Sequence, residues 1–166
     1  MRKLLIMGVL LLTSCGFHLR GSVQLAPEMS ELAIQDAGPE TDILPDLKDA
    51  LLSQGVKITA TAPVILQLRN ESYSRRVLSV DVSGKAQEYE LGYSILVRVQ
   101  GVDGVVWMPD EEVSIQRDLR FDNSAVLATS EEETQLQEDM RRDAISQVLQ
   151  LLRNVKPPVP AKDKAK

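Results

Sequence analysis

Apolar and polar residues alternate with a period of two through the middle of the chain, from Leu66 to Phe121. A period of two is typical of β-strands with one buried and one wet face. Two turn signals divide this stretch, Ser83-Gly84 and the segment 101–104 with its Asp-Gly pair. The sequence therefore predicts three long strands that form an antiparallel meander.

The first of these strands has an interrupted pattern. Its apolar positions share one parity: Leu66, Leu68, Leu78, Val80 and Val82. Polar residues take the other parity and predict a wet face: Gln67, Arg69, Glu71, Arg75, Ser79 and Asp81. Because a polar stretch at 70–76 breaks the apolar face, we expect the strand to bulge or protrude there.

Helical patterns flank the meander. A stripe at 44, 47, 50 and 51 predicts a helix over 42–54, with Pro45 in its first turn and Gly55 after its end. Ser130 and Glu133 match a capping box and predict the start of a final helix, which Pro157 and Pro158 follow. Segment 31–35 predicts a short strand. We therefore expect an α+β fold, a mixed and largely antiparallel sheet with two helices packed on one face.

The first fifteen residues, MRKLLIMGVLLLTSC, resemble the signal and lipobox of bacterial lipoproteins. The apolar run 4–12 is shorter than the ~20 residues of a membrane-spanning helix. The resemblance implies cleavage after residue 14, with Cys15 then carrying an S-diacylglycerol and an N-acyl chain. Gly16, where an Asp would favour the inner membrane in this class, implies the outer membrane. The alternative is an ordinary signal peptide followed by a chance cysteine.

These features predict the domain organisation: a signal peptide at 1–14, an acylated N-terminus and linker at 15–30, one α+β domain at 31–155 and a disordered tail at 156–166. After the signal, 17 basic and 24 acidic residues remain, a formal charge of about −7. Such a charge argues against nucleic acid as a partner. Cys15 is the only cysteine, so no intramolecular disulfide is expected.

No constellation of catalytic residues stands out. His18 is the only histidine, which excludes a histidine-based triad and a multi-histidine metal site. Glu88 and Glu90 share a strand face, but a solvated face explains them better than a glycosidase pair. No phosphate-binding loop or nucleophile elbow is present. We therefore expect a protein that is not an enzyme, with no metal and no cofactor.

Basic residues near the ends of the first long strand are candidates for binding anions. Arg75, Arg76 and Lys85 lie there in an otherwise acidic chain. Guanidinium and ammonium groups on a rigid sheet can pair with phosphate. The alternative interpretation is scattered surface charge.

An ordered set of motifs resembles the LptE family of lipopolysaccharide-assembly lipoproteins. The set covers nearly the whole chain after the signal: CGFHLRG at 15–21, QGV at 54–56, QEYEL at 87–91, RFDN at 120–123 and AVLA at 125–128. The resemblance implies a one-to-one complex with the outer-membrane β-barrel LptD, a position inside that barrel as a plug, and binding of lipopolysaccharide during its insertion into the outer leaflet.

The loop before the middle strand departs from the family pattern. Family members can carry several basic residues there, but in this chain only Lys85 is basic. Arg75 and Arg76 would therefore have to contribute to binding lipid phosphates. A second class of function stays open, a generic outer-membrane lipoprotein that binds an envelope polymer or another secreted protein through its sheet.

Overall fold

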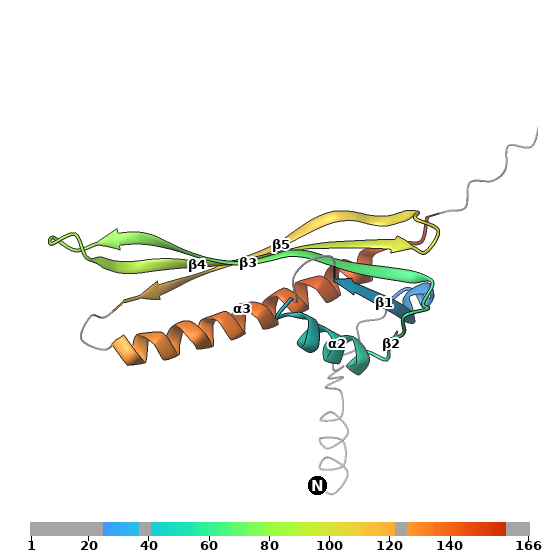
Figure 1. Ribbon diagram of the computed structural model, residues 1–166, viewed down its shortest axis with the longest axis horizontal. Coiled ribbons are helices and arrows are strands. Elements are labelled where there is room, and N and C mark those ends of the chain that lie inside the picture. Colours follow the sequence, from blue (N-terminus) through green and yellow to red (C-terminus); the bar gives the residue numbers. More distant parts are fainter. Residues whose placement is uncertain (1–24, 37–40, 122–125, 159–166) are drawn as a thin grey trace, which may run out of the picture.

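The computed structural model describes residues 25–36, 41–121 and 126–158, and Figure 1 shows their arrangement. In chain order the elements are η2 (Pro27–Met29), β1 (Glu31–Asp36), α2 (Leu44–Ser53), β2 (Lys57–Ile58), β3 (Val64–Val80), β4 (Ala86–Gly101), β5 (Val106–Arg120) and α3 (Val126–Asn154). The predicted signal peptide, Cys15, most of the linker and the tail from Val159 lie outside these residues.

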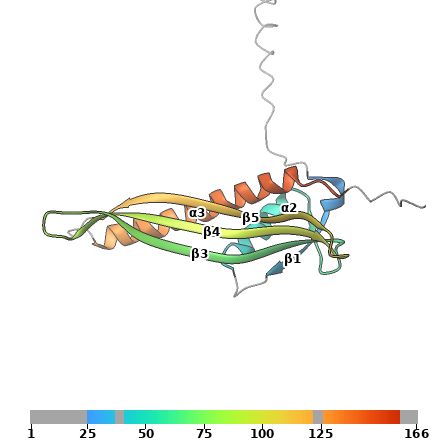
Figure 2. The same cartoon turned by 90° about the horizontal axis from the view of Figure 1, so that it is seen from above.

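Five strands form one mixed sheet in the order β2-β1-β3-β4-β5. Strand β1 runs parallel to β2 and to β3, whereas β3, β4 and β5 are antiparallel neighbours. Helices α2 and α3 lie on the same face of this sheet (Figures 1 and 2). The predicted fold class and the three-stranded meander are confirmed.

The core lies between the two helices and the half of the sheet that contains β1. The residues that build it are almost fully buried: Leu32, Leu47, Leu51, Leu66, Leu68, Ile95, Val97, Met140, Ala144, Val148 and Leu152. Burial of each large aliphatic side chain contributes roughly 1.5–3 kcal/mol. The buried residues of α3 lie on one side of the helix, against the sheet, and the other face of the sheet is left uncovered.

Strand β3 changes faces at Asn70, as the interrupted pattern predicted. Asn70 has a φ of 54°, and its register with β4 shifts between Arg69 and Ser72. One extra residue reverses the facing of the side chains that follow, here as far as the next register shift, after Val77. Glu71 and Arg75 therefore lie on the helix side, where Glu71 accepts a hydrogen bond from Tyr93. The prediction that both belong to the wet face is wrong.

Helix α3 begins at Val126, four residues before the predicted N-cap Ser130. Leu127 and Ala128 are strong helix formers, and the buried Thr129 packs this first turn against the protein. Ser130 is therefore an internal residue, and its carbonyl accepts a hydrogen bond from the Thr134 hydroxyl at 3.0 Å. The predicted helix start is wrong because the capping motif depends on local sequence alone, whereas the burial of Thr129 against the rest of the protein adds a further turn to the helix.

The bulge makes a prediction about stability. Asn tolerates a positive φ, whereas a β-branched residue does not, so Asn70→Val should destabilise the protein by about 1–2 kcal/mol. Asn70→Gly, the control, should be nearly neutral. Urea unfolding followed by circular dichroism measures both; equal stability of the Val and Gly variants would contradict the proposed role of this residue.

Candidate functional site

Arg75 is held beneath the sheet by contacts with α3 and with two aromatic rings. Its Nη1 donates to Glu133 Oε2 at 3.0 Å, and its guanidinium carbon lies 3.7 Å from the centroid of Tyr89. The same guanidinium carbon lies 5.9 Å from the centroid of the Phe121 ring. An arginine that is paired and stacked in this way links the far end of β3 to the helix.

Arg76 lies on the opposite, uncovered face. It is the register partner of Glu90 and donates from Nη2 to Glu90 Oε1 at 2.8 Å. Neighbouring residues in a strand point to opposite faces, so the structure does not bring Arg75 and Arg76 together.

Lys85 lies in the exposed turn between β3 and β4. Asp81 organises this turn by accepting hydrogen bonds from the Ser83 hydroxyl at 2.6 Å and from the backbone N–H of Lys85 at 3.0 Å. These hydrogen bonds, led by that of Ser83, hold the pKa of Asp81 below its ordinary value. The Asp81 carboxylate is committed to the backbone, and the turn presents Lys85 and the fully exposed Val82 to solvent.

The uncovered sheet face is polar and pairs its own charges. Arg69 and Arg98 both pair with Asp110, while Arg120 pairs with Glu88. Glu88 also accepts a hydrogen bond from Ser79 at 2.8 Å. With Glu90 paired to Arg76, the two carboxylates that sequence reasoning considered as a catalytic pair are both engaged in ion pairs on this face.

A shallow hollow of about 130 Å³ lies at the centre of this face around Gly92. Besides Gly92 its lining contains four serines, Ser72, Ser74, Ser94 and Ser114, together with Tyr93, Gln116, Glu90 and Glu112. A Cβ atom at Gly92 would lie 2.4 Å from Ser74 Oγ. Small side chains on neighbouring strands make this part of the face low and flat, so another polypeptide surface can approach it closely.

A polar cluster under the bulge was missed by sequence reasoning. Glu71 accepts hydrogen bonds from the Tyr93 hydroxyl at 2.8 Å and from the Ile43 backbone N–H at 3.4 Å. Arg141 of α3 donates to Asp46 of α2 at 3.0 Å and hydrogen-bonds Tyr73. The cluster joins β3, β4 and both helices. Its one signal in the sequence is the polar stretch that interrupts the first strand.

Burial and the nearby Glu71 carboxylate raise the pKa of Tyr93 far above its ordinary value of 10.0. Burial also raises the pKa of Tyr73. Both phenols therefore stay neutral in the folded protein where they would already ionise in the unfolded chain.

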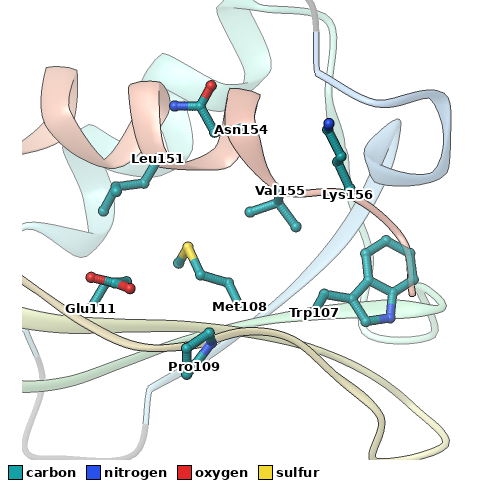
Figure 3. A pocket seen from close by; sticks show the side chains of 8 residues that line it. All are labelled: Trp107, Met108, Pro109, Glu111, Leu151, Asn154, Val155 and Lys156. Carbon is teal, nitrogen blue, oxygen red and sulfur yellow. The ribbon is translucent and has the colours of Figure 1, made fainter. Parts of the chain in front are cut away.

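An apolar pocket of about 440 Å³ opens between β5 and the end of α3 (Figure 3). Its walls come from Trp107, Met108, Pro109, Leu151 and Val155, and its polar lining from Glu111, Asn154 and Lys156. The alternating pattern predicted the buried side of β5. It could not predict that the end of α3 lies opposite Trp107.

The described ranges contain no group of three or more His, Cys, Asp or Glu side chains that could hold a metal ion. No helix within them is both long enough and apolar enough to cross a bilayer. What the arrangement offers chemically is a set of surfaces: a polar sheet face with internal ion pairs, a turn that exposes Lys85, and an apolar pocket.

An α+β domain with these binding surfaces and an N-terminal segment like a lipobox defines a lipoprotein of the bacterial envelope. Residues 29–152 match the family model LptE, described as lipopolysaccharide-assembly. The chain therefore belongs to the LptE family.

Curated relatives agree with this family. The chain is 31% identical over 157 residues to the LPS-assembly lipoprotein LptE of Photorhabdus laumondii, with 92% of this chain and 84% of the relative covered. It is 30% identical over 156 residues to the protein of the same name from Pectobacterium atrosepticum, covering 88% and 80% respectively.

Solved structures show the same fold. An uncharacterized lipoprotein B from Nitrosomonas europaea matches with a TM-score of 0.69 at 28% identity, covering 81% of this chain and 88% of that one. The rare lipoprotein B from Shewanella oneidensis matches with a TM-score of 0.65 at 27% identity, covering 74% and 92%.

The polar cluster predicts a loss of stability in alkali. The raised pKa of Tyr93 contributes stability that is fully present below pH 10, the ordinary pKa, and is lost as the pH rises above it. The wild type should therefore lose stability above about pH 10 more steeply than Tyr93→Phe. At neutral pH the variant should be less stable by about 1 kcal/mol, for the lost hydrogen bond to Glu71. Denaturant unfolding at several pH values measures both; parallel profiles would reject this assignment.

Proposed function

We propose that this LptE-family protein is an outer-membrane lipoprotein that works with the β-barrel LptD to assemble lipopolysaccharide into the outer leaflet. In this proposal it acts as a plug inside the barrel and as a factor that binds lipopolysaccharide. The observation that carries the proposal is the uncovered, self-paired polar sheet face in a chain of this family. It suits the lumen of a large outer-membrane barrel, which is polar.

The dimensions of the meander support the plug. Strand β3 has 17 residues, which at ~3.3 Å per residue extend at most about 55 Å. A bilayer with its headgroups is ~40–45 Å thick. A hairpin of this length can follow a barrel lumen from one side of the membrane to the other. Because Arg69, Arg76, Arg98 and Arg120 pair with carboxylates of the same open face, inserting that face does not bury these four cations without a partner.

The proposed location rests on Cys15. Acylation there would place the protein on the periplasmic leaflet of the outer membrane, facing the periplasm and the barrel lumen. Two or more acyl chains give stable anchoring where a single chain does not. The relatives named as lipoproteins support this part of the proposal.

For lipopolysaccharide, we assign phosphate binding to Arg75, Arg76 and Lys85, with Lys85 as the most accessible of the three. Arg75 and Arg76 are already paired, with Glu133 and with Glu90. Lys85 is exposed, and the hydrogen-bonded turn around Asp81 holds its backbone. A phosphate approaching the end of the hairpin meets Lys85 first, and the two arginines can contribute only by exchanging partners.

Purification from solubilised outer membranes tests the plug. We expect a large β-barrel to co-purify with this protein in equal amount. A Cys15→Ala precursor is the control: it should lose membrane anchoring, while its folded domain keeps its affinity for the barrel. Recovery of the protein without a barrel would reject the plug and favour the generic lipoprotein.

Charge reversal at the turn tests lipopolysaccharide binding. Lys85→Glu should weaken binding of purified lipopolysaccharide by roughly tenfold, the effect of losing one charge-assisted contact and adding repulsion. Adding Arg75→Glu and Arg76→Glu should weaken it further, with barrel association intact. The matched control is Lys57→Glu on β2, an exposed lysine paired with Glu31. Unchanged binding in the triple variant would remove these residues from the site.

A further inference from the structure

A group of exposed apolar side chains lies at the end of the molecule away from Lys85. It surrounds the turn between β4 and β5, where the exposed fractions of Val102, Val105 and Val106 are 66%, 42% and 39%. Trp107 follows directly and is partly exposed. We call Val102, Val105, Val106, Trp107 and Lys156 the proximal surface. Aliphatic side chains without cover, next to a tryptophan and a lysine, have the composition of a surface that meets a lipid headgroup layer.

The proximal surface is held in a defined shape. The N–H of Val105 donates to Asp103 Oδ1 at 3.0 Å, so this carboxylate is committed to the turn, and Gly104 has a φ of 81°. A Cβ atom at Gly101 would lie 3.4 Å from Nε1 of Trp107, which places the indole against the same turn. The valines and the indole are therefore presented together by a structured turn.

The apolar pocket continues this surface inward. Trp107 and Lys156 both line it, as Figure 3 shows. Beyond them the wall is apolar, formed mainly by Met108, Leu151 and Val155. A volume of about 440 Å³ lined by Trp107 and these apolar side chains can accept an acyl chain from an adjoining lipid layer. Lys156 at the rim supplies a cation for a lipid phosphate, and the sequence that follows contains three further lysines, at 162, 164 and 166.

The end of the molecule at which the described chain begins indicates which lipid layer this would be. The described chain begins at Leu25, and the following η2 lies at the same end of the molecule as the turn between β4 and β5 (Figures 1 and 2). Nine residues lie between Cys15 and Leu25, so ten steps of the chain join the two. At ~3.3–3.6 Å per residue they reach at most about 35 Å. An acylated Cys15 would therefore keep this end close to the leaflet that holds its acyl chains.

We propose that the proximal surface rests on the phospholipid leaflet to which the chain is tethered, as a second membrane contact beside the acylated cysteine. The inference rests on the proposed acylation of Cys15. Val102, Val105 and Val106 enter the headgroup region, Trp107 lies at the boundary and Lys156 faces lipid phosphate. A weak contact is sufficient, because a short tether gives an effective concentration in the millimolar range.

Trp107 provides a direct test because it is the only tryptophan of the chain. The acylated full-length protein is reconstituted into vesicles of phosphatidylethanolamine and phosphatidylglycerol whose acyl chains carry bromine, a contact quencher of indole. We expect Trp107 emission to shift to the blue and to be quenched. The control is Trp107→Phe with Val82→Trp, which moves the indole to the fully exposed turn at the far end of the hairpin. Its emission should stay red-shifted and unquenched.

Matched charge substitutions identify the contact. Val102→Asp with Val105→Asp should reduce quenching of Trp107 several-fold, because both side chains leave the lipid layer. Val80→Asp with Val82→Asp, two exposed valines of the far turn, should leave it unchanged. All four positions are exposed, and circular dichroism verifies the fold.

Three results would overturn the inference. Trp107 could be quenched no more than the tryptophan introduced at position 82. Trp107 emission could instead shift to the blue without lipid because the protein dimerises, which sedimentation detects. Or the emission could shift only when the barrel is present. In each case the acylation and the plug would still stand. If the protein fails to float with the vesicles, the tether itself is wrong, and both the proposed anchoring and this inference fall.

Discussion

The arrangement of this protein depends on the change of register in β3 at Asn70 and on the side chain of Glu71 that it turns inward. Without the extra residue, Arg75 would lie on the open face, and Glu71 could not accept hydrogen bonds from Tyr93 and Ile43. A carboxylate placed under a sheet carries a large desolvation cost unless it is hydrogen-bonded. The two donors offset that cost and tie β3 to β4 and to the start of α2.

The change of register divides the sheet into two halves that pack against the helices through different interactions. On one side of the bulge, Leu66 and Leu68 pack under α2 and α3 in an apolar core. On the other side, α3 meets the sheet partly through ion pairs, Arg75 with Glu133 and Arg117 with Asp143. Exposed ion pairs contribute little stability, typically about 0–1 kcal/mol each. The hairpin end of the molecule therefore depends more on strand pairing than on burial.

A domain whose sheet is covered on one face only suits a protein that acts through its surfaces. The helices cover one face and complete the core, so the other face is free to meet a polar wall. The long hairpin carries Lys85 far from the end where the described chain begins. In the proposed function, the end where the described chain begins, the polar face and the turn that carries Lys85 are separated along one axis, which allows one small domain to contact a leaflet, a barrel lumen and a lipid phosphate.

The sequence by itself determined the fold class, because the period of two from Leu66 to Phe121 predicts strands, and the signals over 42–54 and from Ser130 predict two helices. It also indicated the family and an irregularity near Asn70. Tertiary structure alone decided which way β3 turned after that irregularity, and so placed Arg75 on the helix side and Arg76 on the open face. It also moved the start of α3 to Val126 and placed Trp107 opposite Val155. Local patterns record which residues share a face of one element, whereas these outcomes depend on contacts between segments that are distant in the chain.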